Sequence, residues 1–267
     1  MHRDCKLAGP PVTRPTVIPR PVDCPDGSLA GVRPEQNLMT RNEIITADDL
    51  WEAACSHFPS FSREGQRVGL VLLQELAGGE PVAIAQLAQA LGTPFEMAEA
   101  LVTDSALSPF IHKGDDGRIQ GFYGLSVRPT HHQLTINGRR LWAWCAPDTL
   151  LYPELLRGTV AVETRDPETG ELVRLTVSPD RIEAVKPKDV AVSIRRPEAW
   201  DATSAARIMA TACHFNFFFA SRESGERWVE KHPETVLQPL DAIYAFMKRI
   251  NTHLFNAELA RLRADAA

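Results

Sequence analysis

Two short stretches of this 267-residue chain hold side chains that could do chemistry together. In the first, Cys145 is followed three residues later by Asp148. A cysteine that ends a strand just before a helix gains from the partial positive charge of the helix terminus, which favours the reactive thiolate. A partly buried carboxyl beside a thiolate should have a raised pKa, which would make it a usable proton donor. The same spacing also fits a purely structural pair, with Cys145 as a small core residue and Asp148 as a helix cap.

The second stretch is Cys213-His214, at the edge of a very apolar run. A cysteine–histidine pair could bind soft or borderline metals such as mercury, zinc or copper. A buried cysteine beside a histidine at the core edge is the structural alternative. A third pair, His131-His132, precedes a predicted hairpin and is expected to lie in a surface loop.

Composition limits the classes of function. The formal net charge of −5 argues against a dedicated nucleic-acid or anionic-membrane binder, since either needs a basic surface. Five scattered cysteines do not indicate a disulfide framework, so a reducing compartment is expected. No apolar run is long enough to span a membrane, and no signal core follows Met1–Lys6. We therefore expect a cytoplasmic protein with no nucleic-acid or membrane partner.

The N-terminal part of the chain, residues 1–43, is predicted to be a flexible tail. Seven of the twenty prolines fall within the first 34 residues, and a periodic apolar pattern is nearly absent. Cys5 and Cys24 lie in this tail. Their presence is either incidental, or the tail captures soft metal and passes it inward.

Residues 44–126 are predicted to form a winged-helix-like domain. Periodic apolar residues indicate helices, a Gly92 turn separates two of them, and a strand pair flanks the Gly114–Gly117 turn. The helices are expected at Arg63–Ala77, Val82–Leu91 and Thr93–Asp104, and the strands at Phe110–His112 and Gly121–Ser126. The last helix holds three acidic residues and no lysine or arginine, which disfavours contact with DNA phosphates.

Residues 127–267 are predicted to be an α+β core of antiparallel strands and helices. Short strands around turn signals such as Asn137-Gly138 predict hairpins. The expected strands are Gln133–Ile136, Arg140–Trp144, Val160–Thr164, Leu172–Val177, Val190–Ile194 and Phe215–Phe219. The expected helices are Asp148–Leu156, Thr203–Ala212, Gly225–Lys231 and a long amphipathic one at Pro239–Arg263.

Several segments together resemble the alkylmercury lyase (organomercurial lyase) family in order and spacing. The Trp-Cys-Ala-x-Asp-Thr-Leu core around Cys145 and the Leu-Thr-Val-Ser-Pro string are the most specific of them. The matching segments are Tyr123–Thr130, Gly138–Leu150, Thr169–Gly170, Leu175–Pro179 and His214–Ser221. The resemblance implies a winged-helix-like N-terminal part followed by an α+β core, which agrees with the organisation expected from the residues alone.

The resemblance also implies a reaction, the protonolysis of a carbon–mercury bond to a hydrocarbon and Hg(II). Cys145 would attack mercury as a thiolate and Asp148 would protonate carbon. Because mercury(II) is soft, added thiolate ligands push electron density onto it and weaken its bond to carbon. No organic cofactor is implied. Exogenous thiols or a mercury reductase would remove the inorganic mercury, as in mercury resistance.

The chain departs from the family pattern at the second catalytic cysteine, where Ala212 stands and the cysteine, Cys213, comes one residue later. A one-residue shift turns a side chain to the other face of a strand, or by about 100° on a helix. Cys213 can therefore act only if a bulge or local re-registration turns it inward. Three functions stay open: an organomercurial lyase using Cys145, Asp148 and Cys213, an enzyme of this fold acting on another substrate, or a non-catalytic thiol protein that binds metal.

Overall fold

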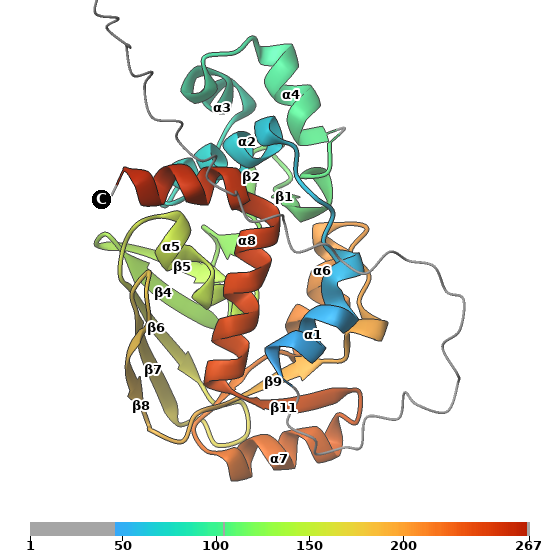
Figure 1. Cartoon of the computed structure of the whole chain (residues 1–267), viewed down its shortest axis with the longest axis vertical. Helices are drawn as coiled ribbons and strands as arrows, with labels where there is room; N and C mark the ends of the chain where they lie inside the picture. Colours follow the sequence, from blue (N-terminus) through green and yellow to red (C-terminus); the bar gives the residue numbers. More distant parts are fainter. Residues whose placement is uncertain (1–45, 104, 266–267) are drawn as a thin grey trace, which may run out of the picture.

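The computed structural model describes residues 46–103 and 105–265 (Figure 1). The predicted tail of residues 1–43, with Cys5 and Cys24, lies outside them. Within the described ranges, no helix combines the length and the apolar character that crossing a membrane requires.

Helices dominate the first part of the described chain. They are α1 (Ala47–Ala54), the 3-10 helix η1 (Cys55–His57), α2 (Arg63–Leu76), α3 (Ile84–Leu91) and α4 (Phe95–Thr103). The Ser62 hydroxyl caps α2 by accepting from the Gly65 amide, and α3 ends at Gly92, whose φ of 68° suits glycine. α2, α3 and α4 thus lie close to their predicted ranges. The single strand expected at Gly121–Ser126 is wrong, because a turn at Tyr123 and Gly124, both with positive φ, divides it between two antiparallel strands.

A larger antiparallel sheet forms one wall of the molecule. Among the described residues it has eight strands in the order β1-β2-β3-β5-β4-β6-β7-β8. They are Ile111–Lys113 (β1), Ile119–Phe122 (β2), Leu125–Ser126 (β3), His132–Ile136 (β4), Arg139–Ala143 (β5), Val160–Arg165 (β6), Leu172–Val177 (β7) and Ile182–Lys186 (β8). Because β3 pairs with β5, strands on both sides of residue 127 belong to one sheet.

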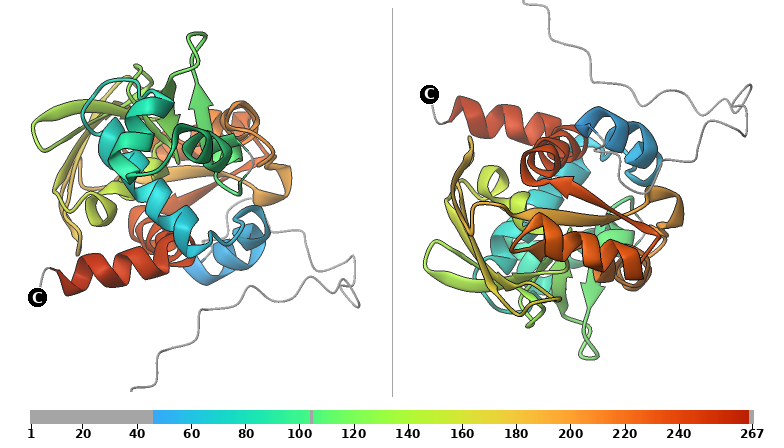
Figure 2. Two further views of the ribbon diagram at one scale, coloured as in Figure 1. Left: turned by 90° about the horizontal axis from the view of Figure 1, so that it is seen from above. Right: turned by 90° about the horizontal axis from the view of Figure 1, so that it is seen from below.

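A smaller antiparallel sheet lies at the opposite side of the core and carries α7 on its outer face (Figures 1 and 2). Within the described part it has three strands in the order β10-β9-β11. The elements of this region are β9 (Ala191–Arg195), the 3-10 helix η4 (Pro197–Ala199), α6 (Ala205–Thr211), the 3-10 helix η5 (Cys213–Phe215), β10 (Phe218–Phe219), α7 (Arg222–Lys231) and β11 (Thr235–Pro239).

The long helix α8 (Leu240–Ala264) links these parts. It contacts α1 and α2 of the helical region, the segment after β5, and both β9 and β11. Its apolar residues, such as Ile243, Phe246 and Ile250, are buried. A kink at Phe255, with φ −126° and ψ 25°, bends it, as the red ribbon in Figure 1 shows. The helix was predicted from its periodicity, but the kink was not.

Two predicted elements near the reactive residues are corrected. The helix expected at Asp148–Leu156 is a 3-10 helix, η3 (Pro147–Leu150), followed by the short α5 (Tyr152–Leu155). The strand expected at Phe215–Phe219 is only Phe218–Phe219, because η5 occupies Cys213–Phe215. Both changes come from tight turns that an apolar run does not reveal.

Candidate active site

Cys145 lies where the chain leaves β5 and turns into η3. The neighbouring backbone is fixed on both sides: the Trp144 amide donates to the Gly124 carbonyl at 2.7 Å, and the Ala146 amide donates to the Asn216 carbonyl at 3.1 Å. Three separate segments therefore meet around the sulfur. The side chain is buried and its thiol is free.

Asp148 is half-buried, and its carboxyl faces back toward Cys145. Its Oδ2 accepts a hydrogen bond from the Cys145 amide at 3.1 Å, so the carboxyl closes the turn that carries the cysteine. Gly124, with φ 81°, lies directly behind it: a Cβ placed there would be 2.5 Å from the Asp148 Cγ. The close approach of this glycine gives the carboxyl its position.

Cys213 points into the same site. The sequence alone left the direction of this side chain open. α6 ends at Thr211, and Ala212 takes the non-helical angles φ −129° and ψ −64° before η5 begins at Cys213. The regular geometry of α6 is therefore lost one residue before Cys213. The two sulfur atoms and a carboxylate oxygen of Cys145, Cys213 and Asp148 lie within 4.8 Å of one another. The three predicted site residues are thus brought together.

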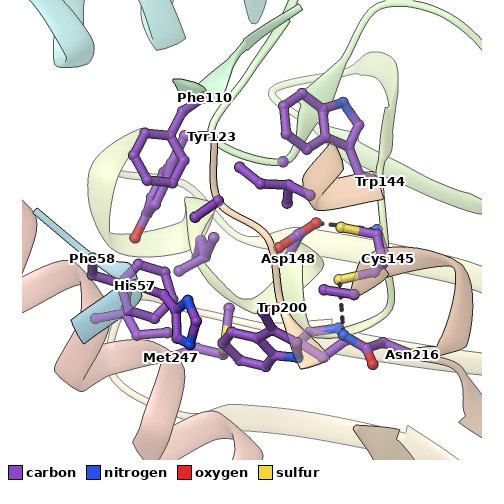
Figure 3. A pocket seen from close by; sticks show the side chains of 18 of the residues that line it. His57, Phe58, Phe110, Tyr123, Trp144, Cys145, Asp148, Trp200, Asn216 and Met247 are labelled. Carbon is purple, nitrogen blue, oxygen red and sulfur yellow. Dashed lines mark hydrogen bonds between the residues drawn. The ribbon is translucent and has the colours of Figure 1, made fainter. Parts of the chain in front are cut away.

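A cavity of about 90 Å³ opens beside these three residues (Figure 3). Most of its wall is apolar or aromatic. It includes Phe58, Phe110, Trp144, Trp200, Met247 and Ile250, with Asn216 and Asp201 among the polar members. The described residues that line it contain no lysine or arginine. Such a lining suits an uncharged organic group.

Burial sets the protonation of the site. It raises the pKa of Asp148 to about 7, and the hydrogen bonds from Cys145 only partly oppose this. Burial also raises the pKa of the Cys145 thiol well above its usual range, and the neighbouring Cys213 and Asp148 add to the rise. The raised carboxyl pKa was predicted. Burial and these two neighbours favour the neutral thiol, so the thiolate expected for Cys145 stays a prediction for its reaction with mercury.

The pKa of the Cys213 thiol is also raised. The hydrogen bond with Cys145 lowers it, but burial and the Asp148 carboxyl outweigh this effect. Tyr123 and Tyr152, both fully buried near Asp148, have pKa values raised well above the usual range, chiefly by burial. The site therefore holds neutral thiols beside a carboxyl that titrates near neutral pH.

Several contributors to the site were not predicted from the sequence. Asn216 contacts Cys145 through its side-chain amide, and Gly124 supports Asp148. Gly124 and Asn216 both lie in segments that carry the family resemblance, which was a usable signal, but nothing in the sequence indicated the contact that each one makes. The surface position expected for His131-His132 is wrong for His132, which is buried against Thr164 with a pKa lowered to about 3 by burial.

Comparison with known proteins agrees with this geometry. A family model described as alkylmercury lyase matches residues 125–252. An alkylmercury lyase of Streptomyces lividans is 37% identical over 188 residues, covering 70% of this chain and 83% of that protein. One of Staphylococcus epidermidis is 35% identical over 170 residues, covering 64% of this chain and 74% of that protein. One of Bacillus cereus is 39% identical over 162 residues, covering 61% of this chain and 70% of that protein.

The fold has a solved counterpart. The crystal structure of a mercury-bound form of MerB2 superposes with a TM-score of 0.63 at 24% identity, covering 77% of this chain and 98% of that one. Fold and site together define a mixed α+β protein with two thiols and a carboxyl at an apolar cavity. The chain belongs to the alkylmercury lyase family.

Proposed function

We propose that this chain is an organomercurial lyase, which cleaves a carbon–mercury bond by protonolysis and yields a hydrocarbon and Hg(II). One observation carries the proposal: Cys145, Cys213 and Asp148 place two sulfurs and a carboxylate oxygen within 4.8 Å at an apolar cavity. Two thiolates suit a soft metal, and the carboxyl is the proton source that the departing carbon needs.

The reaction begins with the organomercurial bound to an exogenous thiolate. The Cys145 sulfur replaces that thiolate on mercury, and the Cys145 proton leaves with the released thiol. Because mercury takes the place of the proton on sulfur, a thiol with a high pKa can still react. The Cys213 thiol then adds to mercury and gives its proton to the Asp148 carboxylate.

Protonation of carbon completes the reaction. The Asp148 carboxylic acid transfers its proton to the carbon as the carbon–mercury bond breaks, and that bond's electron pair forms the new carbon–hydrogen bond. A hydrocarbon leaves, Asp148 is again a carboxylate, and Hg(II) stays on the Cys145 and Cys213 thiolates. A pKa of about 7 lets one carboxyl both take and give this proton near neutral pH.

The proposal also includes the removal of Hg(II), the cell compartment and the domain organisation. The scheme uses no organic cofactor, and exogenous thiols or a mercury reductase take the bound Hg(II) in a reducing cytoplasm. Residues 44–126 form a winged-helix-like domain ahead of a catalytic core of residues 127–267. The succession of α2, α3, α4 and the β1–β2 pair supports the winged-helix-like part, which β3 joins to the sheet of the core through its pairing with β5. The helices would serve to cover the substrate rather than to bind nucleic acid.

The test is to incubate reduced protein with phenylmercury and excess thiol, and to measure benzene release against a Cys145→Ser control. Benzene from the wild type and none from the control is the expected result, and a Cys213→Ala variant should slow release strongly. Tight mercury binding without benzene would leave a metal-binding thiol protein. Neither binding nor benzene would leave an enzyme of this fold acting on another substrate.

A further inference from the structure

Asn216 is a buried polar residue that touches the reactive sulfur. It follows η5 and is 5% exposed. Its Nδ2 lies 3.9 Å from the Cys145 Sγ, within the range of a hydrogen bond to sulfur, and Figure 3 shows this contact as a dashed line. The pairing joins residues 71 positions apart in the sequence.

The direction of the Asn216 amide is fixed by a second contact. The Arg195 backbone amide lies 2.8 Å from the Asn216 Oδ1. A backbone N–H can only donate, so the atom facing it must be the amide oxygen, and the NH2 group must face the sulfur. The same residue accepts from the Ala146 amide through its own carbonyl, which holds the turn that carries Cys145.

The titratable side chains around Cys145 supply no positive charge to its sulfur. The titratable side chains that influence it are Asp148 on η3, Cys213 on η5 and Tyr152 on α5, which are all acids. His57, a basic group in the cavity lining, has its pKa lowered by burial and is uncharged at neutral pH. A sulfur that gains negative charge here therefore needs an oriented neutral donor.

We propose that Asn216 is a positioning residue for Cys145: its NH2 group holds the sulfur toward the cavity and stabilises the negative charge the sulfur gains as it bonds to mercury. The proposal rests on the proposed function, because it concerns the step in which Cys145 captures the organomercurial. Asn216 does not contact Asp148 among the hydrogen bonds of the described residues, so it serves capture and not protonation of carbon.

The variant that isolates the donor is Asn216→Asp. It keeps the side-chain shape and an oxygen for the Arg195 amide, and replaces the NH2 group with a second oxygen. Asn216→Leu removes both polar atoms and excludes rescue by a protonated carboxyl. Ser193→Ala is the matched control, because the Ser193 hydroxyl bonds the Phe215 carbonyl at 2.6 Å and the Phe217 amide at 3.0 Å on either side of Asn216 without touching the sulfur.

Two steps are measured separately with phenylmercury: its capture on Cys145 against a competing thiol, by quenched flow and mass spectrometry, and benzene release from the captured adduct. Capture should slow by about tenfold or more in both Asn216 variants, as for loss of one hydrogen bond to a charged group. Benzene release from the adduct should stay within about threefold, and Ser193→Ala should change capture by less than about threefold.

Capture at the wild-type rate in both Asn216 variants would overturn the proposal. Equal slowing in Ser193→Ala would also overturn it, because support of the segment would then explain the effect. A wild type that captures phenylmercury but forms no benzene would contradict the proposed function, and the capture rates would still decide the role of Asn216.

Discussion

Asp148 is the residue on which protonation depends, because it must hold a proton and release it at the same pH. Its carboxyl meets this need through burial, with a pKa of about 7. Asn in its place keeps the shape and an oxygen for the Cys145 amide but offers no acidic proton. We expect Asp148→Asn to slow benzene release from phenylmercury by about 100-fold or more.

Binding of phenylmercury distinguishes the loss of the acid in Asp148→Asn from misfolding of the variant. Because both sulfurs remain, Asp148→Asn should still bind phenylmercury in a one-to-one adduct that is visible by mass spectrometry. If the variant loses both phenylmercury binding and benzene release, the role given to Asp148 is contradicted. It is also contradicted if the variant releases benzene at the wild-type rate.

The same carboxyl should make stability depend on pH. Its pKa is about 7 in the folded protein against 3.8 for the unperturbed group. The folded state therefore binds more protons than the unfolded state between about pH 4 and 7, and stability falls as pH rises through that window. The difference in unfolding free energy between Asp148→Asn and wild type should grow by about 2–4 kcal/mol in favour of the variant from pH 5 to pH 8.

Urea unfolding of the two proteins at both pH values measures this difference. The comparison cancels the titration of other groups, which the two proteins share. A difference that stays constant between pH 5 and pH 8 would show that the Asp148 pKa is not raised in the folded state.

The reactive pair and the raised pKa of its carboxyl could be predicted from the sequence, but the protonation state of Cys145 could not. The Cys145–Asp148 pair and the raised pKa of the carboxyl follow from type and spacing. The state of Cys145 does not, since it depends on how deeply the whole site is buried and on Cys213 and Asp148 as neighbours. The role of Asn216 was not predicted for a related reason, because its contact with Cys145 exists only once two distant segments have packed together.

At the scale of elements, the β2–β3 turn positions the acid. Tyr123 and Gly124 both have positive φ, and Gly124 leaves no room for a side chain against Asp148. Gly124→Ala should therefore displace the carboxyl and strain the turn. We expect benzene release to fall by about tenfold or more, with some loss of stability and with phenylmercury capture by Cys145 retained.

A glycine in a turn remote from the acid makes a suitable control for that variant. Gly138, in the β4–β5 turn, also has positive φ, but a Cβ there would meet no atom within 4 Å. Gly138→Ala should strain its turn without slowing benzene release from the captured adduct. If both variants slow release equally, general destabilisation and not displacement of Asp148 is the cause.

The break between α6 and η5 decides whether Cys213 can act. The apolar run after His214 predicted a strand, and the pattern before it predicted a helix through Ala212. Neither pattern fixes the angles at the junction, yet a single non-helical residue there turns the following side chain into the cavity. Helices and hairpins were predictable because their periodicity extends over many residues. This junction was not predictable, since it depends on the backbone angles of a single residue.

At the scale of the whole molecule, the cavity is assembled from segments that are distant in sequence. Phe58 follows η1, Phe110 ends the 3-10 helix before β1, Trp200 follows η4 and Met247 belongs to α8. Helix α8 contacts α1 and α2, η3, and the strands β9 and β11, so it brings these segments to one place. An α+β class could be predicted from the elements, but a lining of this kind depends on their packing.

This lining should select substrates by charge. The described lining residues include no lysine or arginine, and the carboxylate of Asp201 is already paired at 2.7 Å with Arg207, which is not part of the lining. A carboxylate on the organic group would be desolvated without a partner. We expect kcat/KM for 4-carboxyphenylmercury to be at least about tenfold below that for 4-carbamoylphenylmercury, which has the same size without the charge.

Asp201→Asn should narrow this gap, because it keeps the shape of the side chain but removes the carboxylate that pairs with Arg207, which leaves that guanidinium uncompensated near the cavity. The two substrates are compared by initial rates of arene release with wild type and variant at one pH and one ionic strength. Equal kcat/KM values for the acid and the amide with the wild type would mean that the organic group points to solvent during the reaction. The aromatic residues of the cavity would then have a structural role only, and the choice of substrate would rest on mercury and its two thiolates.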